Sequence, residues 1–142
     1  MTVYLDASVL VSLLVDDSNT AVARRLNERA PLIALSDWTT VECSSALARL
    51  TRMNRLTPQE RDEIEDALDQ WTSRVSRVIA VIPQDFGVGR RFVRQGDSGL
   101  RGSDALHLAI AARERLEIAT FDLVLARAAA EVGVAVHQFD SA

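Results

Sequence analysis

Short apolar runs rich in β-branched residues alternate along the chain with longer stretches in which apolar residues recur with helical period. This alternation is typical of an α/β domain. Enough helical sequence separates successive strand candidates for a crossover, so we expect a mostly parallel sheet with helices on both faces. The predicted strands are Thr2–Leu5, Leu32–Leu35, Val78–Ile82, Ile118–Thr120 and Val134–His137.

Capping residues indicate where some of the helices begin and end. Thr57 and Glu60 have the spacing of a capping box and predict the start of a long helix. Ser18 is the predicted N-cap of a helix that runs through Leu26. Gly133 is expected to end the last helix just before the final strand.

The segment from Gln84 to Val93 has a helical pattern that two glycines, Gly87 and Gly89, weaken. They do not form a dinucleotide-binding motif, because no third glycine follows at the required spacing. Beyond them, Ser103 is the predicted N-cap of a helix that is apolar nearly all round. Such a helix is expected to be buried.

Composition fits one compact domain that spans residues 1–142. The chain is 48% hydrophobic, with few glycines and prolines. Its first apolar run has no basic leader and is interrupted by polar residues, so we expect neither a signal peptide nor a membrane span and a cytoplasmic location. Cys43, the only cysteine, cannot form an internal disulfide and is predicted to be a small buried hydrophobe.

The charge composition excludes several classes of enzyme. All 16 basic residues are arginine. The absence of lysine excludes phosphate-binding P-loops, Schiff-base enzymes and phospho-acceptor receiver domains, all of which need one. Arginine suits phosphate contacts because its planar group binds phosphate oxygens bidentately, although a GC-rich genome accounts for the same composition.

Four acidic residues are predicted to meet at one edge of the sheet. Asp6 ends the first strand and Asp122 lies just past the fourth, and ligands of such sheets bind beyond the carboxyl ends of the strands. Asp104 falls in the first turn of the buried helix. Glu42 lies on the flank of the inward stripe of its own helix, near the helix start, from where it can reach the same edge.

Each acid also has a purely structural explanation. Asp104 can complement the helix dipole, Glu42 can close a capping box with Thr39, and Asp122 can cap the helix after it. Asp6 is the hardest to explain in this way, because it follows a buried strand and has no arginine nearby in the sequence.

Converging carboxylates repel one another, so they must either take up protons or bind a cation. Oxygen ligands without a histidine or cysteine set favour magnesium or manganese over zinc. His107, in the buried helix, is expected to be a packed, hydrogen-bonded residue rather than a ligand, and His137 has no evident partner. A magnesium site of this kind typically acts on phosphates, which suggests phosphoester hydrolysis.

Arginines flank two of these acids in the sequence and are candidate contacts to a nucleic-acid backbone. Without the four acids, 16 acidic residues remain against 16 basic ones, so the rest of the molecule is neutral overall. The alternative is an ordinary solvated helix face. The candidate residues are Arg49, Arg52 and Arg55 after Glu42, and Arg90, Arg91, Arg94 and Arg101 before Asp104.

Four segments, "YLDASVLV", "VECSSALAR", "RGSDALHLAIA" and "ATFD", resemble in order and spacing the motifs of PIN-domain nucleases of the VapC toxin type. The resemblance extends from Val3 nearly to the C-terminus. It implies a PIN-like three-layer α/β/α sandwich with a mostly parallel central sheet. It also implies a catalytic, metal-binding quartet that consists of Asp6, Glu42, Asp104 and Asp122. Ser8 and Thr120 correspond to the small hydroxyl residues that assist this site.

The resemblance implies further a Mg²⁺- or Mn²⁺-dependent endoribonuclease toxin that hydrolyses RNA phosphodiesters, often in transfer RNA or other structured RNA. Such proteins are usually homodimers and are inhibited by a cognate VapB-type antitoxin encoded beside them. One rival is a non-catalytic PIN-like module whose acidic pocket binds a basic partner peptide. A small phosphatase is the other, although the "DAS" motif lacks the second aspartate of aspartyl-phosphate enzymes.

Overall fold

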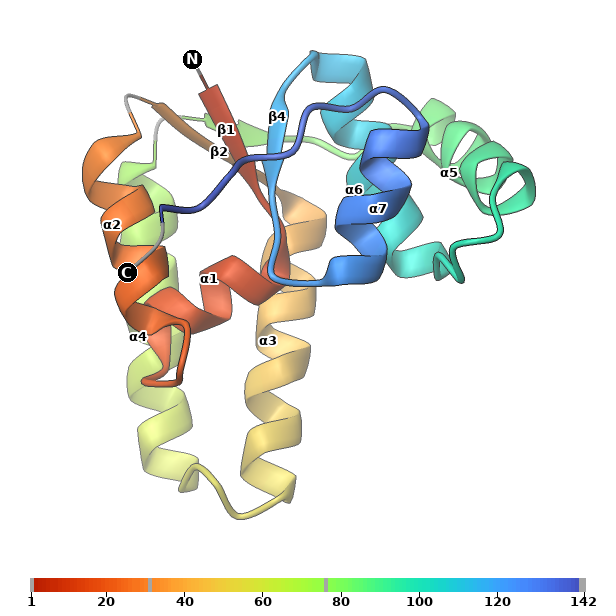
Figure 1. The fold of residues 1–142 in the computed structure, drawn as a ribbon. Coiled ribbons are helices and arrows are strands. Elements are labelled where there is room, and N and C mark those ends of the chain that lie inside the picture. The colour runs from red at the N-terminus through yellow and green to blue at the C-terminus, as the bar shows by residue number, and fades with distance from the viewer. Residues whose placement is uncertain (1, 31, 76, 141–142) are drawn as a thin grey trace.

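The computed structural model describes residues 2–30, 32–75 and 77–140. Among the described residues, two helices follow each of the first three strands and one follows the last (Figure 1). Within these ranges the strands are β1 (Thr2–Leu5), β2 (Leu32–Ser36), β3 (Arg77–Ile79) and β4 (Glu117–Ala119). The helices are α1 (Ala7–Leu14), α2 (Thr20–Arg29), α3 (Asp37–Arg52), α4 (Pro58–Arg74), α5 (Pro83–Gln95), α6 (Gly102–Glu114) and α7 (Leu123–Glu131).

The strands form one sheet in the order β3-β2-β1-β4, and every pair in it is parallel. β1 lies in the middle, with Val3 opposite Ile33 of β2 and Glu117 of β4. The predicted parallel sheet is therefore confirmed, with boundaries that differ from the predictions by a few residues.

The prediction of a fifth strand at Val134–His137 is wrong. This segment makes a single parallel bridge, between Val136 and Ile118. The Ile118 N–H donates to the Ala135 carbonyl and the His137 N–H to the Ile118 carbonyl. Because β4 stops at Ala119 and the chain then turns toward α7, no further ladder can form.

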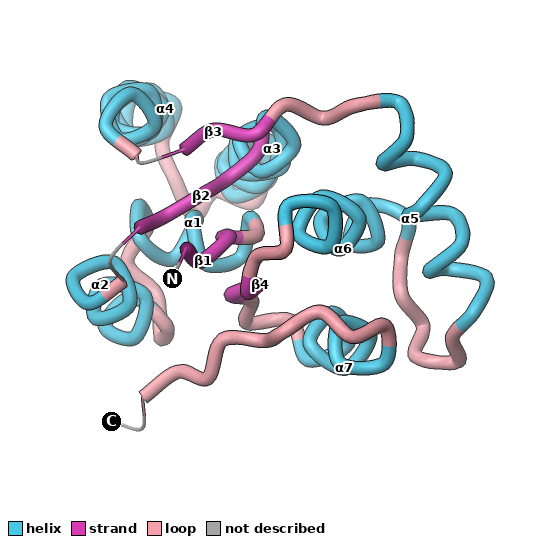
Figure 2. Tube along the Cα trace, turned by 90° about the horizontal axis from the view of Figure 1, so that it is seen from above, coloured by secondary structure: helices cyan, strands magenta, loops and turns pink. Residues whose placement is uncertain are grey.

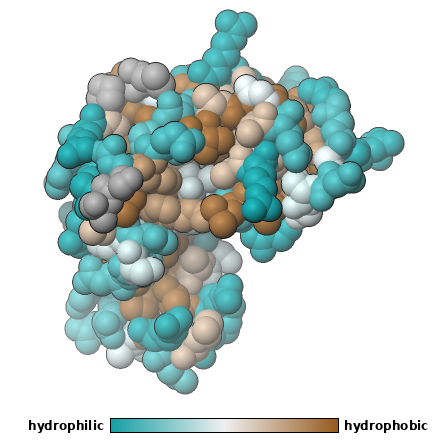
Figure 3. Space-filling model, in the orientation of Figure 1, coloured by the Kyte–Doolittle hydropathy of each residue, from teal (hydrophilic) through white to brown (hydrophobic). Residues whose placement is uncertain are grey.

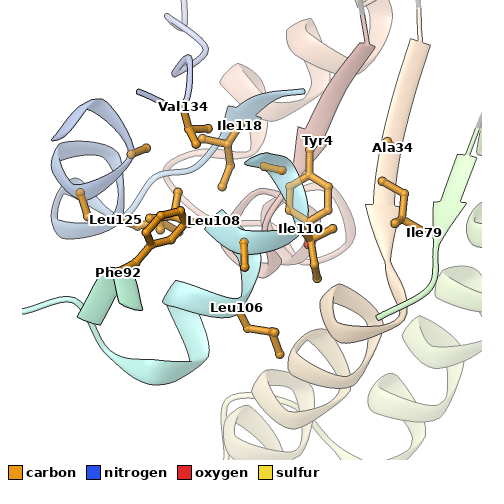
Figure 4. Packing of buried hydrophobic residues seen from close by; sticks show 14 residues of the cluster. Tyr4, Ala34, Ile79, Phe92, Leu106, Leu108, Ile110, Ile118, Leu125 and Val134 are labelled. Carbon is orange, nitrogen blue, oxygen red and sulfur yellow. The ribbon is translucent and has the colours of Figure 1, made fainter. Parts of the chain in front are cut away.

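Side chains alternate between the two faces of the sheet, and helices cover both faces (Figure 2). Val3, Leu5 and Ile33 pack with residues of α1 and α2. On the other face Tyr4 and Ala34 belong to the largest buried cluster, together with residues of α5, α6 and α7 (Figure 4). The three-layer α/β/α sandwich is thus confirmed.

α3 and α4 form a hairpin that extends beyond the carboxyl end of the sheet (Figure 1). A third cluster, which includes Leu10, Cys43, Leu47 and Leu68, joins this hairpin to α1. Apolar residues are visible between α3 and α4, and further apolar patches lie over the upper part of the same face (Figure 3). The expected burial of Cys43 is confirmed, and that burial raises the pKa of its thiol to about 12.

Two of the predicted helix boundaries are confirmed. The Glu60 N–H donates to the Thr57 hydroxyl at 3.0 Å, and the Thr57 N–H donates to the Glu60 carboxylate at 3.1 Å. This reciprocal pair is a capping box. Gly133 follows the end of α7 with a φ of 80°, a conformation that favours glycine.

Two predicted N-caps are wrong. α2 begins at Thr20, and Asn19 rather than Ser18 occupies its N-cap position. Asp17 organises this turn instead, since its carboxylate accepts from the Asn19 N–H. α6 begins at Gly102 after Arg101, which places Ser103 inside the first turn.

α5 continues through both of its glycines. A Cβ at Gly89 would lie 3.4 Å from the Ala105 carbonyl oxygen of α6, which is an ordinary van der Waals contact and shows that the two helices pack closely at this glycine. At Gly87 an added Cβ would meet nothing within 4 Å. Close packing of α5 on α6 thus outweighs the low helix propensity of glycine. None of the described helices is both long and apolar enough to cross a membrane.

Candidate metal and nuclease site

The four acids predicted from the sequence line one cavity of about 460 Å³. The beginnings of α1, α3, α6 and α7 gather at the carboxyl end of the sheet, where this cavity opens (Figure 1). Asp6 comes directly from the central strand, Asp122 follows β4, and Glu42 and Asp104 come from α3 and α6. The topology therefore brings together residues that are far apart in the sequence.

Asp6 is held by three hydrogen bonds although it is only 4% exposed. The Val9 N–H and the Ser8 hydroxyl donate to Oδ1 at 3.1 and 2.6 Å, and the Thr120 hydroxyl donates to Oδ2 at 2.5 Å. Ser8 and Thr120, which were predicted to assist the site, therefore both donate to Asp6. Burial nevertheless raises the pKa of Asp6 above its ordinary value, so its ionised form is costly in the protein alone.

Asp122 caps α7 from the wall of the cavity. Its Oδ1 accepts from the Val124 and Leu125 N–H groups at 2.9 and 3.3 Å. The Asp122 N–H in turn donates to the Thr120 hydroxyl at 3.0 Å. The structural explanation of this aspartate is thus confirmed, and the same residue still lines the cavity.

Asp104 interacts electrostatically with two of the other acids, Asp122 and Glu42. Burial raises its pKa, the bond from Arg101 Nε to Oδ2 at 3.1 Å opposes this, and the negative charges of Asp122 and Glu42 raise it further. The side chain of Arg101 itself is 74% exposed. One exposed guanidinium therefore contacts one member of a mutually repelling group of acids.

Glu42 does not form the capping box considered for it. That box is closed by Ser36 and Thr39, because α3 begins at Asp37 and Glu42 lies in the second turn. Its Oε2 instead lies 2.5 Å from Nε2 of His107, which is 1% exposed. The prediction that His107 is a packed, hydrogen-bonded residue is confirmed.

Three of the candidate arginines, Arg49, Arg52 and Arg101, line the acidic cavity. Arg90 lines a separate apolar groove, and the Arg91 guanidinium lies 5.8 Å from the centre of the Phe92 ring. The described residues that line the acidic cavity do not include Arg55, Arg90, Arg91 or Arg94.

His137 lies away from the cavity and does have a partner, contrary to expectation. Its Nδ1 is 2.6 Å from a carboxylate oxygen of Glu117, at the start of β4. The local sequence gave no sign of this pair, because it connects residues on either side of α7.

The donor set of the cavity suits magnesium or manganese, since it offers carboxylate oxygens and two of the carboxyl groups have raised pKa values that a cation would oppose. As the side chains stand, however, no three described His, Cys, Asp or Glu residues form a group able to hold a metal ion. Each of the four carboxylates instead makes hydrogen bonds with other groups of the protein. The residues thus fit the ion in chemistry and location, and a bound ion would compete with Arg101 for the Asp104 carboxylate.

Sequence reasoning missed the polar side chains that lie behind the cavity. The Tyr4 hydroxyl is 2.7 Å from Nδ1 of His107 and 2.8 Å from the Ser36 hydroxyl. Burial raises the pKa of this phenol well above its ordinary value, so the hydroxyl keeps its proton. The one available signal was a tyrosine inside a short buried strand, which normally needs a hydrogen-bond partner.

A family profile described as PIN domain matches residues 3–131. The chain belongs to the PIN-domain family. The match covers all the described helices and strands except the first residue of β1. The resemblance noted in the sequence is therefore confirmed for this PIN-domain protein. A search of curated proteins finds no match.

Solved structures with the same fold include one titled as a toxin and one titled as a toxin-antitoxin complex from Klebsiella pneumoniae. The Mycobacterium tuberculosis VapC20 structure, titled a Sarcin-Ricin loop cleaving toxin, has a TM-score of 0.72 at 19% identity, over 89% of this chain and 94% of that one. FitAcB from Neisseria gonorrhoeae gives 0.69 at 21%, over 96% of both chains. VapBC2 from Rickettsia felis, bound to a promoter DNA fragment, gives 0.69 at 17%, over 99% of this chain and 100% of that one. At these identities the likeness shows the fold.

Proposed function

We propose that this PIN-domain protein is the endoribonuclease toxin of a VapBC-type toxin-antitoxin pair and requires Mg²⁺ or Mn²⁺. The observation that carries the proposal is the cavity in which four carboxylates from four separate segments meet beside three arginines. One of the structures with a similar fold is a toxin titled as cleaving the Sarcin-Ricin loop, which supports RNA as the substrate. The proposal treats residues 1–142 as one domain that acts in the cytoplasm, as a homodimer.

Asp6, Glu42, Asp104 and Asp122 would hold the metal ion. Bound there, the ion supplies an activated water and neutralises charge on the phosphate oxygens. Ser8 and Thr120 orient Asp6 through their hydroxyl donors. Arg49 and Arg52 line the cavity on the α3 side, and they are the proposed contacts to the phosphates of a bound strand.

A cognate antitoxin is the proposed inhibitor. An apolar groove of about 520 Å³ lies between α3, α5 and α6, and it shares Ser103 with the acidic cavity. Phe86, which is 61% exposed, and Trp38 line this groove. An antitoxin segment with apolar residues for the groove and an arginine for the carboxylates would complement both surfaces. A similar fold solved as a toxin-antitoxin complex supports this assignment.

Cleavage of RNA by the purified protein tests the proposal. We expect structured RNA to be cut with magnesium or manganese and to remain intact with a chelator. Asp6→Asn should abolish cutting and relieve growth arrest on expression. The matched control Asp62→Asn removes an exposed carboxylate on α4 and should cut at the wild-type rate. Equal cutting by Asp6→Asn and the control would refute the proposal. Phosphate release from free nucleotides without RNA cleavage would instead indicate the phosphatase.

A second candidate function is a non-catalytic module whose acidic cavity receives a basic peptide. It is favoured by the finding that, among the described residues, the acids are bonded to protein groups and not grouped as metal ligands. This candidate predicts binding of an arginine-containing peptide and no heat on titration with manganese. The nuclease predicts binding heat with manganese that Asp6→Asn abolishes.

A further inference from the structure

A buried chain of hydrogen bonds leads from the centre of the sheet to the acidic cavity. It begins at Tyr4, whose ring projects from β1 into the main core cluster (Figure 4). The Tyr4 hydroxyl lies 2.7 Å from Nδ1 of His107, and Nε2 of the same ring lies 2.5 Å from Oε2 of Glu42. Tyr4 is fully buried and His107 is 1% exposed, so water does not compete for the bond between them, whereas the Glu42 side chain is 22% exposed at the cavity.

For a neutral imidazole, the partners of the hydrogen-bond chain fix its direction. An ionised carboxylate only accepts, so the bond to Glu42 requires a proton on Nε2 of His107. In the neutral ring Nδ1 is then an acceptor, and the Tyr4 hydroxyl donates to it. The Tyr4 oxygen can accept from Ser36, whose own Oγ accepts from the Thr39 N–H at 3.2 Å. Each proton in the chain thus has an acceptor.

This chain of hydrogen bonds also joins the strand and the helices that carry the acidic residues of the site. Tyr4 is two residues before Asp6 on the central strand, His107 is three residues after Asp104 on α6, and Glu42 is on α3. A displacement of α6 relative to α3 would break the bond between His107 and Glu42. β1 therefore positions Asp6, which follows it directly, and also positions Glu42 through Tyr4 and His107.

We infer that Tyr4 is a positioning residue: it fixes the ring of His107 as an Nε2–H donor and thereby holds the Glu42 carboxylate at the acidic cavity. The inference rests on the proposed metal-dependent function of that cavity. Residues that orient a metal ligand in this way typically contribute about 10- to 100-fold to metal affinity or activity. Tyr4→Phe removes the one hydroxyl and keeps the ring in the core.

Nitrogen NMR of the metal-free protein tests the tautomer. The sequence has two histidines, and His137, paired with Glu117 elsewhere, serves as an internal reference. We expect His107 to be protonated at Nε2 alone in the wild type, with an Nδ1 signal that moves in Tyr4→Phe while that of His137 stays. A proton on Nδ1 of His107 in the wild type, alone or together with one on Nε2, would overturn the inference.

Manganese titration and RNA cleavage test the consequence. In Tyr4→Phe we expect about 10- to 100-fold weaker manganese binding and a lower kcat with little change in KM for RNA. His107→Gln can restore an N–H donor near Glu42 and should bind manganese more tightly than His107→Leu. The matched control Asp85→Asn breaks the buried ion pair with Arg113, away from the cavity, and should lose stability but keep wild-type affinity and kcat.

The outcomes separate the inference from the function that it assumes. A wild-type protein that neither binds manganese nor cleaves RNA refutes the proposed function and the positioning role with it. A wild-type protein that does both, with Tyr4→Phe equal to it in affinity and kcat, refutes the positioning role alone. The role is equally refuted when Asp85→Asn loses as much manganese affinity as Tyr4→Phe, because general destabilisation then explains the loss.

Discussion

Manganese should stabilise the wild-type protein against unfolding and should not stabilise Asp6→Asn. The substitution keeps an oxygen that can accept from the Ser8 hydroxyl and the Val9 N–H, and it replaces the oxygen that accepts from Thr120. A hydrogen bond to a charged group contributes about 1.5–3 kcal/mol, and removing a buried charge contributes a gain of similar size. We therefore expect the metal-free variant to lie within about 1 kcal/mol of the wild type.

The metal-dependent part of stability is larger. A ligand at about 100 times its Kd adds about 2.7 kcal/mol to the free energy of unfolding. For a chain of this length that corresponds to a rise in Tm of about 10 °C. Thermal unfolding with and without manganese should show this rise in the wild type and in the exposed control Asp62→Asn, and less than about 2 °C in Asp6→Asn. An equal rise in Asp6→Asn would refute the assignment of Asp6 as a ligand.

Three smaller predictions concern stability, each measured by urea unfolding of the metal-free protein. Burial raises the pKa of Asp6 and Asp104, so above pH 3.8, their ordinary pKa, the native state holds protons that the unfolded state has released, and stability should fall as the pH rises. Asp6→Asn should make this fall less steep. An unchanged slope would contradict the assignment of the pH dependence to Asp6. Gly87→Ala should raise the free energy of unfolding by about 1 kcal/mol, because the added Cβ meets nothing within 4 Å and alanine favours the helix. A lower free energy of unfolding would contradict the open space seen at Gly87. Thr57→Ala should destabilise by about 1 kcal/mol through loss of the capping box, whereas no change would mean that the cap contributes little.

Most of the fold follows from local patterns in the sequence. The apolar runs predict the four paired strands, and the capping box at Thr57 predicts the start of α4. The errors arise where tertiary structure decides. Val134–His137 has a strand-like composition but finds only one residue of β4 to pair with. Ser18 has the chemistry of an N-cap, yet the turn organised by Asp17 places the N-cap of α2 one residue later, at Asn19.

The meeting of the four acids could be predicted because parallel strands deliver their carboxyl ends to one edge. The support of Glu42 could not be predicted. Tyr4 and His107 are 103 residues apart, and Glu42 and His107 are 65 apart. No periodicity or cap relates residues at such separations, so only the packing of α3 and α6 on the sheet reveals that they touch.

The structural and chemical roles of the acids are not alternatives, and this affects how they should be tested. Asp6 caps α1 and Asp122 caps α7 while both line the cavity. An alanine at either position removes a cap, at about 1 kcal/mol, together with the charge, so lost activity would have two causes. Asparagine caps a helix about as well as aspartate and lacks the charge. Only Asp→Asn substitutions therefore separate folding from chemistry here, and a folded, inactive Asp122→Asn would assign the chemistry to the charge.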